Sequence, residues 1–438
     1  MEKVGRKFAM RRMKLTTWIL IAMVLGILVG WMCHELLPTP ESAKTVAGYI
    51  SLFTDIFLRL IKMIIAPLVF STLVVGIAHM GDAKSLGRIG LKTMAWFITA
   101  SLMSLLLGMV LVNVLRPGDG LNFPLPDVGA STNLKTASLS LKEFVTHLVP
   151  KSVFEAMANN EILQIVVFSV FFGAAAASFG KRASAVVDWV EQVSHVMLKV
   201  TAYVMALAPL AVFAAMAAIV TTQGLGILWT YGKFMGQFYL GILILWVLLA
   251  FAGFIFLGPR ITRLIALIRE PIMLAFSTAS SEAAYPKTLE QLERFGASKK
   301  ITSFVLPLGY SFNLDGSMMY CTFATLFIAQ AYKIELTTSQ QITMLLILMV
   351  TSKGMAGVPR ASLVVIAATL ATFNIPEAGL LLIMGIDQFL DMGRSATNVV
   401  GNSIATAVVS KWEGELRPEA EAQKELDKDE ALAAPAAA

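Results

Sequence analysis

The chain has 438 residues, of which 57% are hydrophobic and 15% are charged, with a formal net charge of +6. Soluble domains carry about 25% charged residues, so this composition indicates an integral membrane protein. Basic residues crowd the segment before the first apolar run, which argues against nucleic acid as the source of the positive charge. Cys33 and Cys321 offer no disulfide framework, and the four histidines lack the HExxH spacing, so a metalloenzyme is not expected.

Apolar runs dominate the chain up to residue 257. The basic residues 1–14 are expected to stay cytoplasmic by the positive-inside rule. The first run, at about 15–36, is longer than the roughly 7 to 15 apolar residues of a signal peptide and lacks a cleavage site, so it is interpreted as a retained span. Runs of about 20 residues can cross the bilayer as helices. The further runs lie at about 50–80, 93–115, 161–180, 183–219 and 226–257.

The composition changes from residue 258 onward, where apolar segments become short and are interrupted by Ser, Gly and Asn. Two of them, PIMLAFSTASSEAAYP and MLLILMVTSKGMAGVPRASLVVIAATL, share a spacing, because Thr278 and Thr351 each lie eight positions before a proline. Irregular backbone at membrane depth is tolerated only where it is buried in protein or lines a wet cavity. A matched pair of broken segments indicates a transporter binding site, with chance similarity of small residues as the alternative.

The first constellation is TASSEAAYP, at the tip of the first broken segment. Ser280 and Ser281 offer hydroxyls and, at a helix N-terminus, N–H groups that suit an anion. Glu282 beside them is a carboxylate within the membrane and suits proton carriage. The alternative is an N-cap with an acidic first turn, and both interpretations can hold together.

The second constellation is GYSFNLDGSMMY, residues 309–320. Asn313 and Asp315 flank Leu314, just before Gly316, inside an otherwise apolar segment. A turn with exposed carbonyls and with Asn and Asp oxygens is how hard cations are coordinated. A kinked structural helix is the alternative.

The third constellation lies in residues 384–409, which are long enough to cross a bilayer yet carry three charges. On a helix, five polar residues form one stripe about 80° wide. They are Asp387, Asp391, Arg394, Asn398 and Asn402. A charge at the bilayer centre costs at least about 2.5 kcal/mol, so the stripe must face protein or water. Asp391 and Arg394 can form an internal ion pair, or they can bind an amphoteric substrate through its ammonium and carboxylate groups.

These motifs closely resemble the dicarboxylate/amino acid:cation symporter family, the glutamate transporter homologues, and most of all its bacterial proton/glutamate-aspartate symporters. TASSEAAYP, GYSFNLDG, TSKGMAGVP and IDQFLDMGRSATNVVGN occur in order, and FLRLIKMIIAPLVFSTLVVGIA precedes them. The resemblance covers about residues 15–413. It implies an all-α membrane protein with eight transmembrane helices and two re-entrant helical hairpins, built as inverted repeats and assembled as a trimeric elevator-type transporter.

The resemblance also implies a division of the chain. Residues 15–257 would form six transmembrane helices, mostly a trimerisation scaffold, with the third and sixth in the transport domain. Residues 258–413 would form the transport core, with hairpin 1 at about 263–293, helix 7, hairpin 2 at about 338–374, and helix 8. Residues 414–438 are charged and rich in Ala and Pro, which predicts a disordered cytoplasmic tail.

By matching position, Arg394 would bind the side-chain carboxylate of the substrate and Asp391 its amino group. The main-chain groups of the substrate would be held by Asn398, Ser395, Ser280, Ser281, Ser317 and the backbone at Val358. The cation or proton sites would involve Asn313, Asp315, carbonyls near Gly309, Asn402, Ser101, Glu282 and Asp387. No cofactor and no tightly bound metal are implied.

Departures from the family pattern bear on the coupling ion. The sodium-coupled archaeal members have Asp where this chain has Asn402, and Thr where Ala100 stands beside Ser101. Glu282 looks like the bacterial proton-coupled carriers, so a proton is favoured, with Na+ at Asn313 and Asp315 as the alternative. Arg360 replaces a glycine of the family pattern, either as a second carboxylate clamp or as a side chain that snorkels to the interface.

The predicted function is a symporter that imports glutamate or aspartate across the inner membrane, as a homotrimer in the lipid bilayer with both termini cytoplasmic. Dicarboxylate carriers in the family tend to lack the equivalent of Asp391, so its presence favours glutamate or aspartate. A C4-dicarboxylate such as succinate, fumarate or malate is the alternative substrate. A channel would need a polar path through several helices, and an enzyme would need a nucleophile–base or metal set. Neither pattern is visible, and neither an enzyme nor a nucleic-acid partner is expected.

Overall fold

The computed structural model describes residues 15–78, 83–119, 146, 149–225, 231–352, 361–384, 386–418 and 421. Over these ranges the regular structure is helical, and one isolated antiparallel bridge joins Ala297 to Leu416. The all-α fold class is therefore confirmed for the described part of the chain.

The first half of the chain forms long helices whose starts differ from the predicted runs. They are α1 (Leu15–Leu36), α2 (Pro40–Ala78), α3 (Ala83–Leu115), α5 (Val153–Ala158), α6 (Ile162–Phe179), η1 (Gly180–Ala183), α7 (Ser184–Met205), α8 (Ala208–Gln223) and α10 (Gly232–Leu257). α2 and α3 each begin about ten residues before the expected start, because a helix continues through polar residues outside the apolar run. The expected segment 183–219 is divided into α7 and α8 just before Pro209, which cannot donate a backbone hydrogen bond.

Five helical stretches among the described residues are long and apolar enough to cross a membrane. They are Thr17–Leu36, Pro40–Ala78, Gly87–Leu115, Ile162–Met205 and Gly232–Leu257. With the predominance of apolar helices, this supports a multi-pass membrane protein.

The second half of the chain consists of shorter, interrupted helices. They are α11 (Arg260–Thr278), α12 (Ser281–Phe295), α13 (Lys299–Phe312), α14 (Asp315–Ala331), α15 (Thr338–Thr351), α16 (Ala361–Thr372), η3 (Glu377–Leu380), α17 (Leu381–Met384) and α18 (Asp387–Trp412). α11 and α12 pack together as a hairpin that reverses at Ala279, whose φ is +49°. α15 and α16 also pack together, and residues 353–360 between them lie outside the described ranges.

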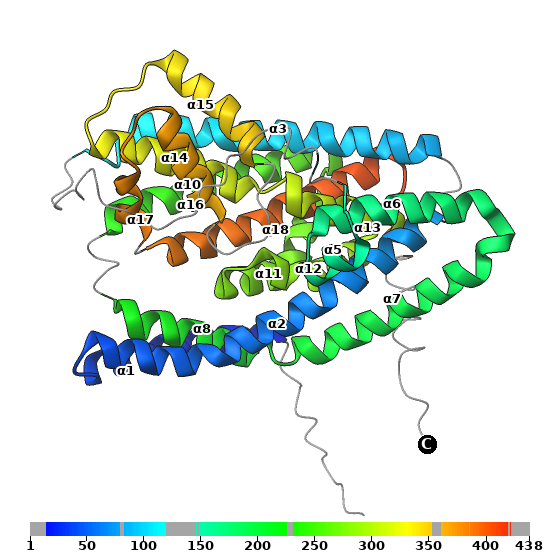
Figure 1. Cartoon of the computed structure of the whole chain (residues 1–438), viewed down its shortest axis with the longest axis horizontal. Coiled ribbons are helices and arrows are strands. Elements are labelled where there is room, and N and C mark those ends of the chain that lie inside the picture. The colour runs from blue at the N-terminus through cyan, green and yellow to red at the C-terminus, as the bar shows by residue number, and fades with distance from the viewer. Residues whose placement is uncertain are drawn as a thin grey trace, which may run out of the picture.

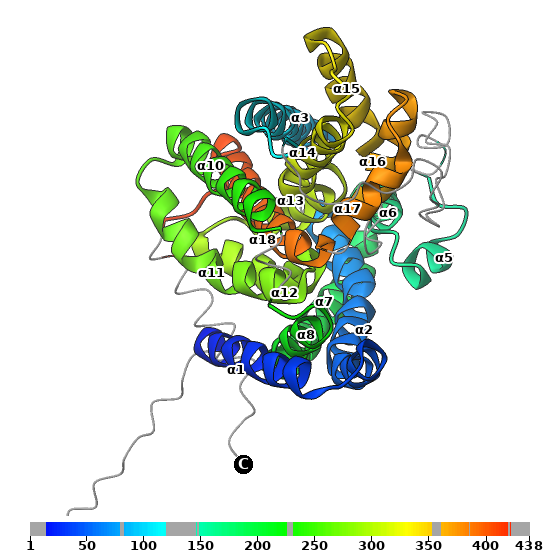
Figure 2. The same cartoon turned by 90° about the vertical axis from the view of Figure 1, so that its left-hand side faces the viewer.

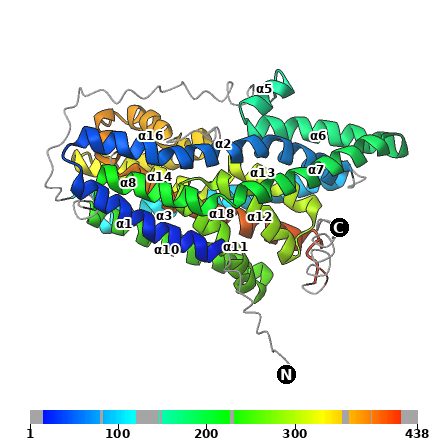
Figure 3. The ribbon, with the colours of Figure 1, turned by 90° about the horizontal axis from the view of Figure 1, so that it is seen from below.

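The helices form two layers, which are seen edge-on in Figure 1 and Figure 2, whereas Figure 3 views them from below, so that one overlies the other. One layer, here the α2–α8 layer, contains α1, α2, α7 and α8. The other, here the α18 core, contains α3 and α10 to α18, with α18 packed among α10, α11, α12, α13 and α14. α6 lies against both layers, because it packs on α2 and on α13.

Small residues and polar contacts hold the α2–α8 layer together. A Cβ added at Gly30 of α1 would lie 2.6 Å from the carbonyl oxygen of Ala217 in α8, so the two backbones are in close contact. Thr54 Oγ1 of α2 donates a hydrogen bond to the carbonyl oxygen of Ala211, at 2.9 Å. Such contacts matter in a membrane, because lipid is as apolar as the side chains and no hydrophobic effect drives the helices together. Close packing and hydrogen bonds supply the attraction instead.

The segment after α18 is fastened to the α18 core rather than free. Glu413 Oε2 lies 2.8 Å from Arg88 Nη2, and its Oε1 lies 2.7 Å from Lys92 Nζ, with the Glu413 side chain 2% exposed. The backbone N–H of Arg417 donates to the carbonyl oxygen of Gly296, at 2.9 Å. Glu413 therefore packs on α3, whereas residues 414–418, which the sequence predicts to begin a disordered tail, pack on the α12–α13 connection, where their polar groups find partners.

Glu413→Gln is expected to destabilise the protein at neutral pH, and the loss of stability is expected to be smaller at acidic pH. Burial acts to raise the pKa of the Glu413 carboxyl, but the hydrogen bonds and charges of Arg88 and Lys92 outweigh it and hold this pKa below its ordinary value. A carboxyl whose pKa is lower in the folded state adds stability above its unfolded pKa of about 4.3 and loses it as the pH falls through the folded value. We expect a loss of about 1 kcal/mol at pH 7, measured by thermal unfolding in detergent, which narrows below about pH 4.

Glu421→Gln is the matched control, because Glu421 is exposed. An equal loss for both variants, or a loss at Glu413 that does not depend on pH, would contradict the ion-pair account.

Candidate functional site

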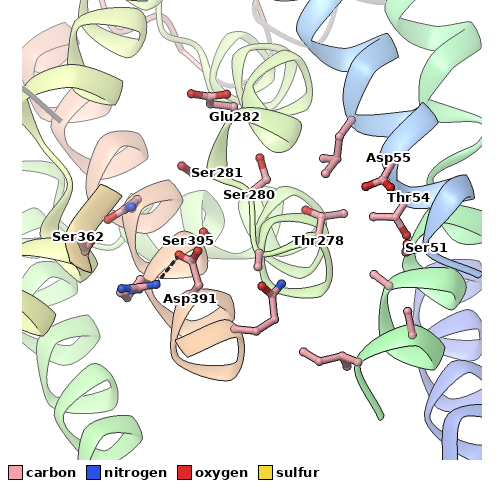
Figure 4. A pocket seen from close by; sticks show the side chains of 18 of the residues that line it. Ser51, Thr54, Asp55, Thr278, Ser280, Ser281, Glu282, Ser362, Asp391 and Ser395 are labelled. Atoms are coloured by element: carbon pink, nitrogen blue, oxygen red, sulfur yellow. Dashed lines mark ion pairs between the residues drawn. The ribbon is translucent and has the colours of Figure 1, made fainter. Parts of the chain in front are cut away.

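A cavity of about 610 Å³ lies between the α2–α8 layer and the α18 core. Figure 4 shows Ser51, Thr54 and Asp55 of α2 on one side and the α11–α12 turn on the other. Eight of the predicted site residues line it. They are Ser280, Ser281 and Glu282 from the hairpin, Ser317 from α14, and Asp391, Arg394, Ser395 and Asn398 from α18. The first and third constellations of the sequence are therefore brought together in one cavity.

Arg394 is the most deeply buried charge of the cavity, with its side chain 1% exposed. Its Nη2 lies 3.1 Å from Asp387 Oδ1 and 3.1 Å from Asp391 Oδ1. The predicted pair with Asp391 is formed, and the structure adds Asp387 as a second partner. Nε and Nη1 of Arg394 are buried and have no hydrogen-bond partner among the described residues, so two nitrogens keep donors for a ligand.

Tyr320 of α14 covers the guanidinium of Arg394. The Arg394 Cζ lies 4.1 Å from the centre of the Tyr320 ring, a cation–π contact. The Tyr320 hydroxyl donates to Asp387 Oδ1 at 3.1 Å, and the Asp387 side chain is 1% exposed. Asp391, whose side chain is 25% exposed, is consequently the carboxylate that an incoming ligand meets.

The α11–α12 turn presents hydroxyls and one carboxylate to the same cavity. Ser280 is the N-cap of α12, and its Oγ accepts a hydrogen bond from the backbone N–H of Ala283 at 3.2 Å. Glu282 lies in the first turn of α12. The capping interpretation is therefore confirmed. The same residues also line the cavity, and their predicted role toward an anion or a proton stays a prediction.

A second polar cluster lies where α13 ends and α14 begins. Asn313 Nδ2 donates to Asp315 Oδ2 at 3.1 Å and to Asn402 Oδ1 at 3.2 Å. Ser104 Oγ of α3 donates to Asp315 Oδ1 at 3.2 Å. The four side chains are fully buried, and three separate elements supply them. The structure thus joins the second constellation to the far end of the α18 stripe.

Two further residues that were predicted to bind the cation lie next to this cluster, and each forms a hydrogen bond with the backbone of α13 or Asn313. Ser101 Oγ of α3 donates to the carbonyl oxygen of Phe312, at 3.5 Å. The carbonyl oxygen of Gly309 accepts the backbone N–H of Asn313, at 2.8 Å. Within the described ranges, His, Cys, Asp and Glu form no group of three that could hold a metal ion.

Asn398 connects the cavity to the buried cluster. Its Oδ1 accepts the backbone N–H of Gly316 at 3.0 Å, and its Nδ2 donates to Ser317 Oγ at 3.4 Å. The first N–H groups of a helix have no partner within the helix, so Asn398 satisfies one of those of α14. A ligand that contacts Asn398 or Ser317 would therefore also disturb the start of α14.

Two predicted site residues lie outside the described ranges, and three residues near the site were not predicted as part of it. Val358 and Arg360 lie outside the described residues, so their predicted roles stay predictions. Tyr320 occurs in the second constellation, but its contact with Arg394 is not visible in the sequence. Asp55 and Lys62 of α2 line the cavity, and the signal for them is a charge within a long apolar helix.

Gly401→Ala is expected to destabilise the protein, because a Cβ at Gly401 would collide with Asp315 Oδ2. Alanine is more favourable than glycine in a helix by about 1 kcal/mol, so helix propensity alone would stabilise this variant. A loss of stability would therefore be due to the collision with Asp315. We expect a net loss of about 1–3 kcal/mol in thermal unfolding. Gly236→Ala on α10 is the control, since an added Cβ there meets nothing and should leave stability unchanged or raised. Equal behaviour of the two variants would show that the cluster is not closely packed.

Comparison with known proteins places the chain in a family. Residues 15–412 match the sodium:dicarboxylate symporter family. The proton/sodium-glutamate symport protein of Geobacillus stearothermophilus is 42% identical over 416 residues, 94% of this chain and 97% of the relative. Its namesake in Bacillus subtilis (strain 168) is 39% identical over 418 residues, 93% and 95% of the two chains. The C4-dicarboxylate transport protein of Laribacter hongkongensis (strain HLHK9) is 41% identical over 403 residues, 91% and 89%. The resemblance seen in the motifs is confirmed: the chain belongs to the sodium:dicarboxylate symporter family.

Proposed function

We propose that this symporter moves glutamate or aspartate across the cytoplasmic membrane together with protons. Membership of the symporter family supports transport rather than catalysis. The observation that carries the substrate class is Arg394, a buried guanidinium with two nitrogens free to donate and with Asp391 beside it at the cavity.

Charge balance at this site favours an amino acid over a dicarboxylate. One guanidinium and the carboxylates of Asp387 and Asp391 leave the cluster with a net negative charge when all three are ionised. A dianion would meet that charge without compensation. An acidic amino acid can place one carboxylate on Arg394 and its ammonium on Asp391, so it brings one net negative charge to the cluster where a dicarboxylate brings two.

The hydroxyl and amide groups around this pair would hold the main-chain groups of the substrate. Ser280, Ser281 and Ser317 line the cavity beside Asn398 and Ser395, within one continuous surface. The backbone at Val358 and the Arg360 side chain would complete the site from the second hairpin, as the family resemblance implies.

Two observations support a proton as the coupling ion. Glu282 stands at the cavity, where its carboxylate can exchange a proton with the same space that the substrate uses. The buried cluster at Asn313 contains Asn402 where sodium-coupled archaeal relatives have a carboxylate, which leaves Asp315 as its single acidic group. A sodium ion at Asn313 and Asp315 is the competing proposal.

Transport of a C4-dicarboxylate is a second candidate, because relatives with that name are as similar to this chain as the glutamate symport proteins. C4-dicarboxylate transport proteins from Laribacter hongkongensis and Cupriavidus taiwanensis are 41% and 42% identical to this chain over 91% of its length. Their similarity equals that of the glutamate symport proteins, so overall identity does not separate the two substrates.

An elevator motion within a homotrimer would bring the site to each side of the inner membrane, with both termini cytoplasmic. The position of the cavity between the α2–α8 layer and the α18 core supports a sliding of one against the other. Exposed apolar side chains on α2 and α7 are available for contacts between protomers or with lipid. They include Leu52, Phe53, Ile56, Trp189 and Val196.

Uptake by purified protein in liposomes tests the proposal. Labelled glutamate, aspartate and succinate would be compared under an imposed proton gradient and an imposed sodium gradient. We expect accumulation of the amino acids driven by the proton gradient. Accumulation of succinate without the amino acids would overturn the substrate, and strict dependence on sodium would overturn the coupling ion.

Asp391→Asn should separate the two substrate classes. Loss of the negative charge leaves a substrate ammonium without its partner, so glutamate uptake should fall about 30-fold or more, as expected when a buried charge pair is broken. Succinate uptake should not fall and is expected to rise. Asp188→Asn, which removes an exposed carboxylate from α7, is the control and should change neither rate. An equal fall for glutamate and succinate would argue against an ammonium at Asp391.

A further inference from the structure

α2 carries charged side chains that face the cavity although it is a long apolar helix. Asp55 and Lys62 both line the cavity, and Lys62 is half-buried. A charge at membrane depth is costly unless it faces water or a partner of opposite sign. Neither side chain belongs to the substrate site proposed above, so these charges call for a separate explanation.

Glu282 of the α11–α12 hairpin shares its surroundings with Lys62 and its neighbours on α2. It lines the main cavity together with Lys62, and it lines a second, small cavity together with Ile65 and Val69 of α2. Lys62, Ile65 and Val69 are spaced i, i+3 and i+7, so they share one face of α2. α12 and α2 are packed together, so Glu282 and this face of α2 border the same space between the two helices.

Other titratable groups line the two cavities that Glu282 also lines. α12, α13, α2 and α18 contribute them to the two cavities. They are Tyr285, Tyr310, Lys44, Asp55, Asp391 and Arg394. Arg394 is already held by Asp387 and Asp391, whereas Lys62 lines the same cavity as Glu282 and carries the opposite charge. Lys62 and Glu282 make no direct ion pair in the described structure, so they act on each other across the cavity.

We propose that Lys62 is the charge partner of Glu282, and that it makes proton binding at Glu282 depend on the position of the α11–α12 hairpin relative to α2. The inference rests on the proposed proton coupling. Lys62 belongs to the α2–α8 layer and Glu282 to the α18 core, so any sliding between the layers changes the distance between the two charges.

The physical consequence is a link between movement and protonation. While Lys62 is near, its positive charge favours the ionised carboxylate at Glu282. When the hairpin moves away from Lys62, the carboxylate loses this attraction and binds a proton more readily. By reciprocity, a proton on Glu282 weakens the hold of α2 on the hairpin and favours that movement.

The test measures how uptake by proteoliposomes depends on external pH. Lys62→Met removes the charge and keeps much of the chain length, whereas Lys62→Arg keeps the charge. Without the cation, we expect the pH midpoint of uptake to rise by about half to one pH unit, as for one unit charge across several ångströms. Lys62→Arg should keep the midpoint of the unaltered protein. In a Glu282→Gln background, where the pH dependence should already be flat, Lys62→Met should produce no shift.

Lys44→Met is the matched control, because Lys44 lies on the same helix and lines the same cavity eighteen positions before Lys62. That separation is about 27 Å along a helix, so its removal should leave the midpoint unchanged. If Lys62→Met does not insert, Lys62→Gln removes the same charge with a polar side chain.

The outcomes separate this inference from the function on which it rests. If Glu282→Gln flattens the pH dependence and Lys62→Met leaves the midpoint in place, the charge partnership is wrong while proton coupling at Glu282 stands. If Glu282→Gln keeps the pH dependence of the unaltered protein, the proposed role of Glu282 fails and this inference fails with it. A shift by Lys62→Met that persists in the Glu282→Gln background would show that Lys62 acts on another group.

Discussion

The burial of the Arg394 guanidinium is the constraint on which the rest of the site depends. A cation held at membrane depth needs opposite charge and hydrogen-bond acceptors, because desolvation would otherwise outweigh any gain. Asp387 and Asp391 supply both from the same helix, at 3.1 Å each, and the Tyr320 ring covers the guanidinium from α14. Among the described residues, Nε and Nη1 have no hydrogen-bond partner. The guanidinium is therefore stabilised and still has N–H groups that can donate to a ligand.

The broken helices follow from the same requirement for polar groups at depth. A continuous helix satisfies its own backbone and offers little to a ligand, whereas a helix end exposes N–H and C=O groups. The break at Asn313 and the turn at Ala279 create such ends beside α18. Side chains then satisfy part of them: Ser280 caps α12, and Asn398 accepts the backbone N–H of Gly316. The hairpin and the broken helix are therefore parts of one polar interior.

The cavity lies at the boundary between two packed layers, so some of its charged pairs lie within one layer and others are divided between the two. Arg394 and Asp391 belong to the α18 core and keep their mutual distance whenever the core moves as one body. Lys62 belongs to α2, so its distance from Glu282 depends on how the layers are placed. A fixed charge pair suits recognition of a substrate, and a pair divided between layers suits a link between protonation and movement.

The sequence by itself determined the membrane class, the polar stripe of α18 and the three motifs, because charged and small residues in apolar runs leave a strong local signal. It also foresaw the Asp391–Arg394 pair and the cap at Ser280, which depend on residues three positions apart or fewer. Only the tertiary structure decided the contacts made across the fold. Tyr320 on Arg394, Ser104 on Asp315, and Glu413 on Arg88 all join residues far apart in the chain. Periodicity reports which face of a helix is buried, but the neighbour of that face is set by how the helices pack.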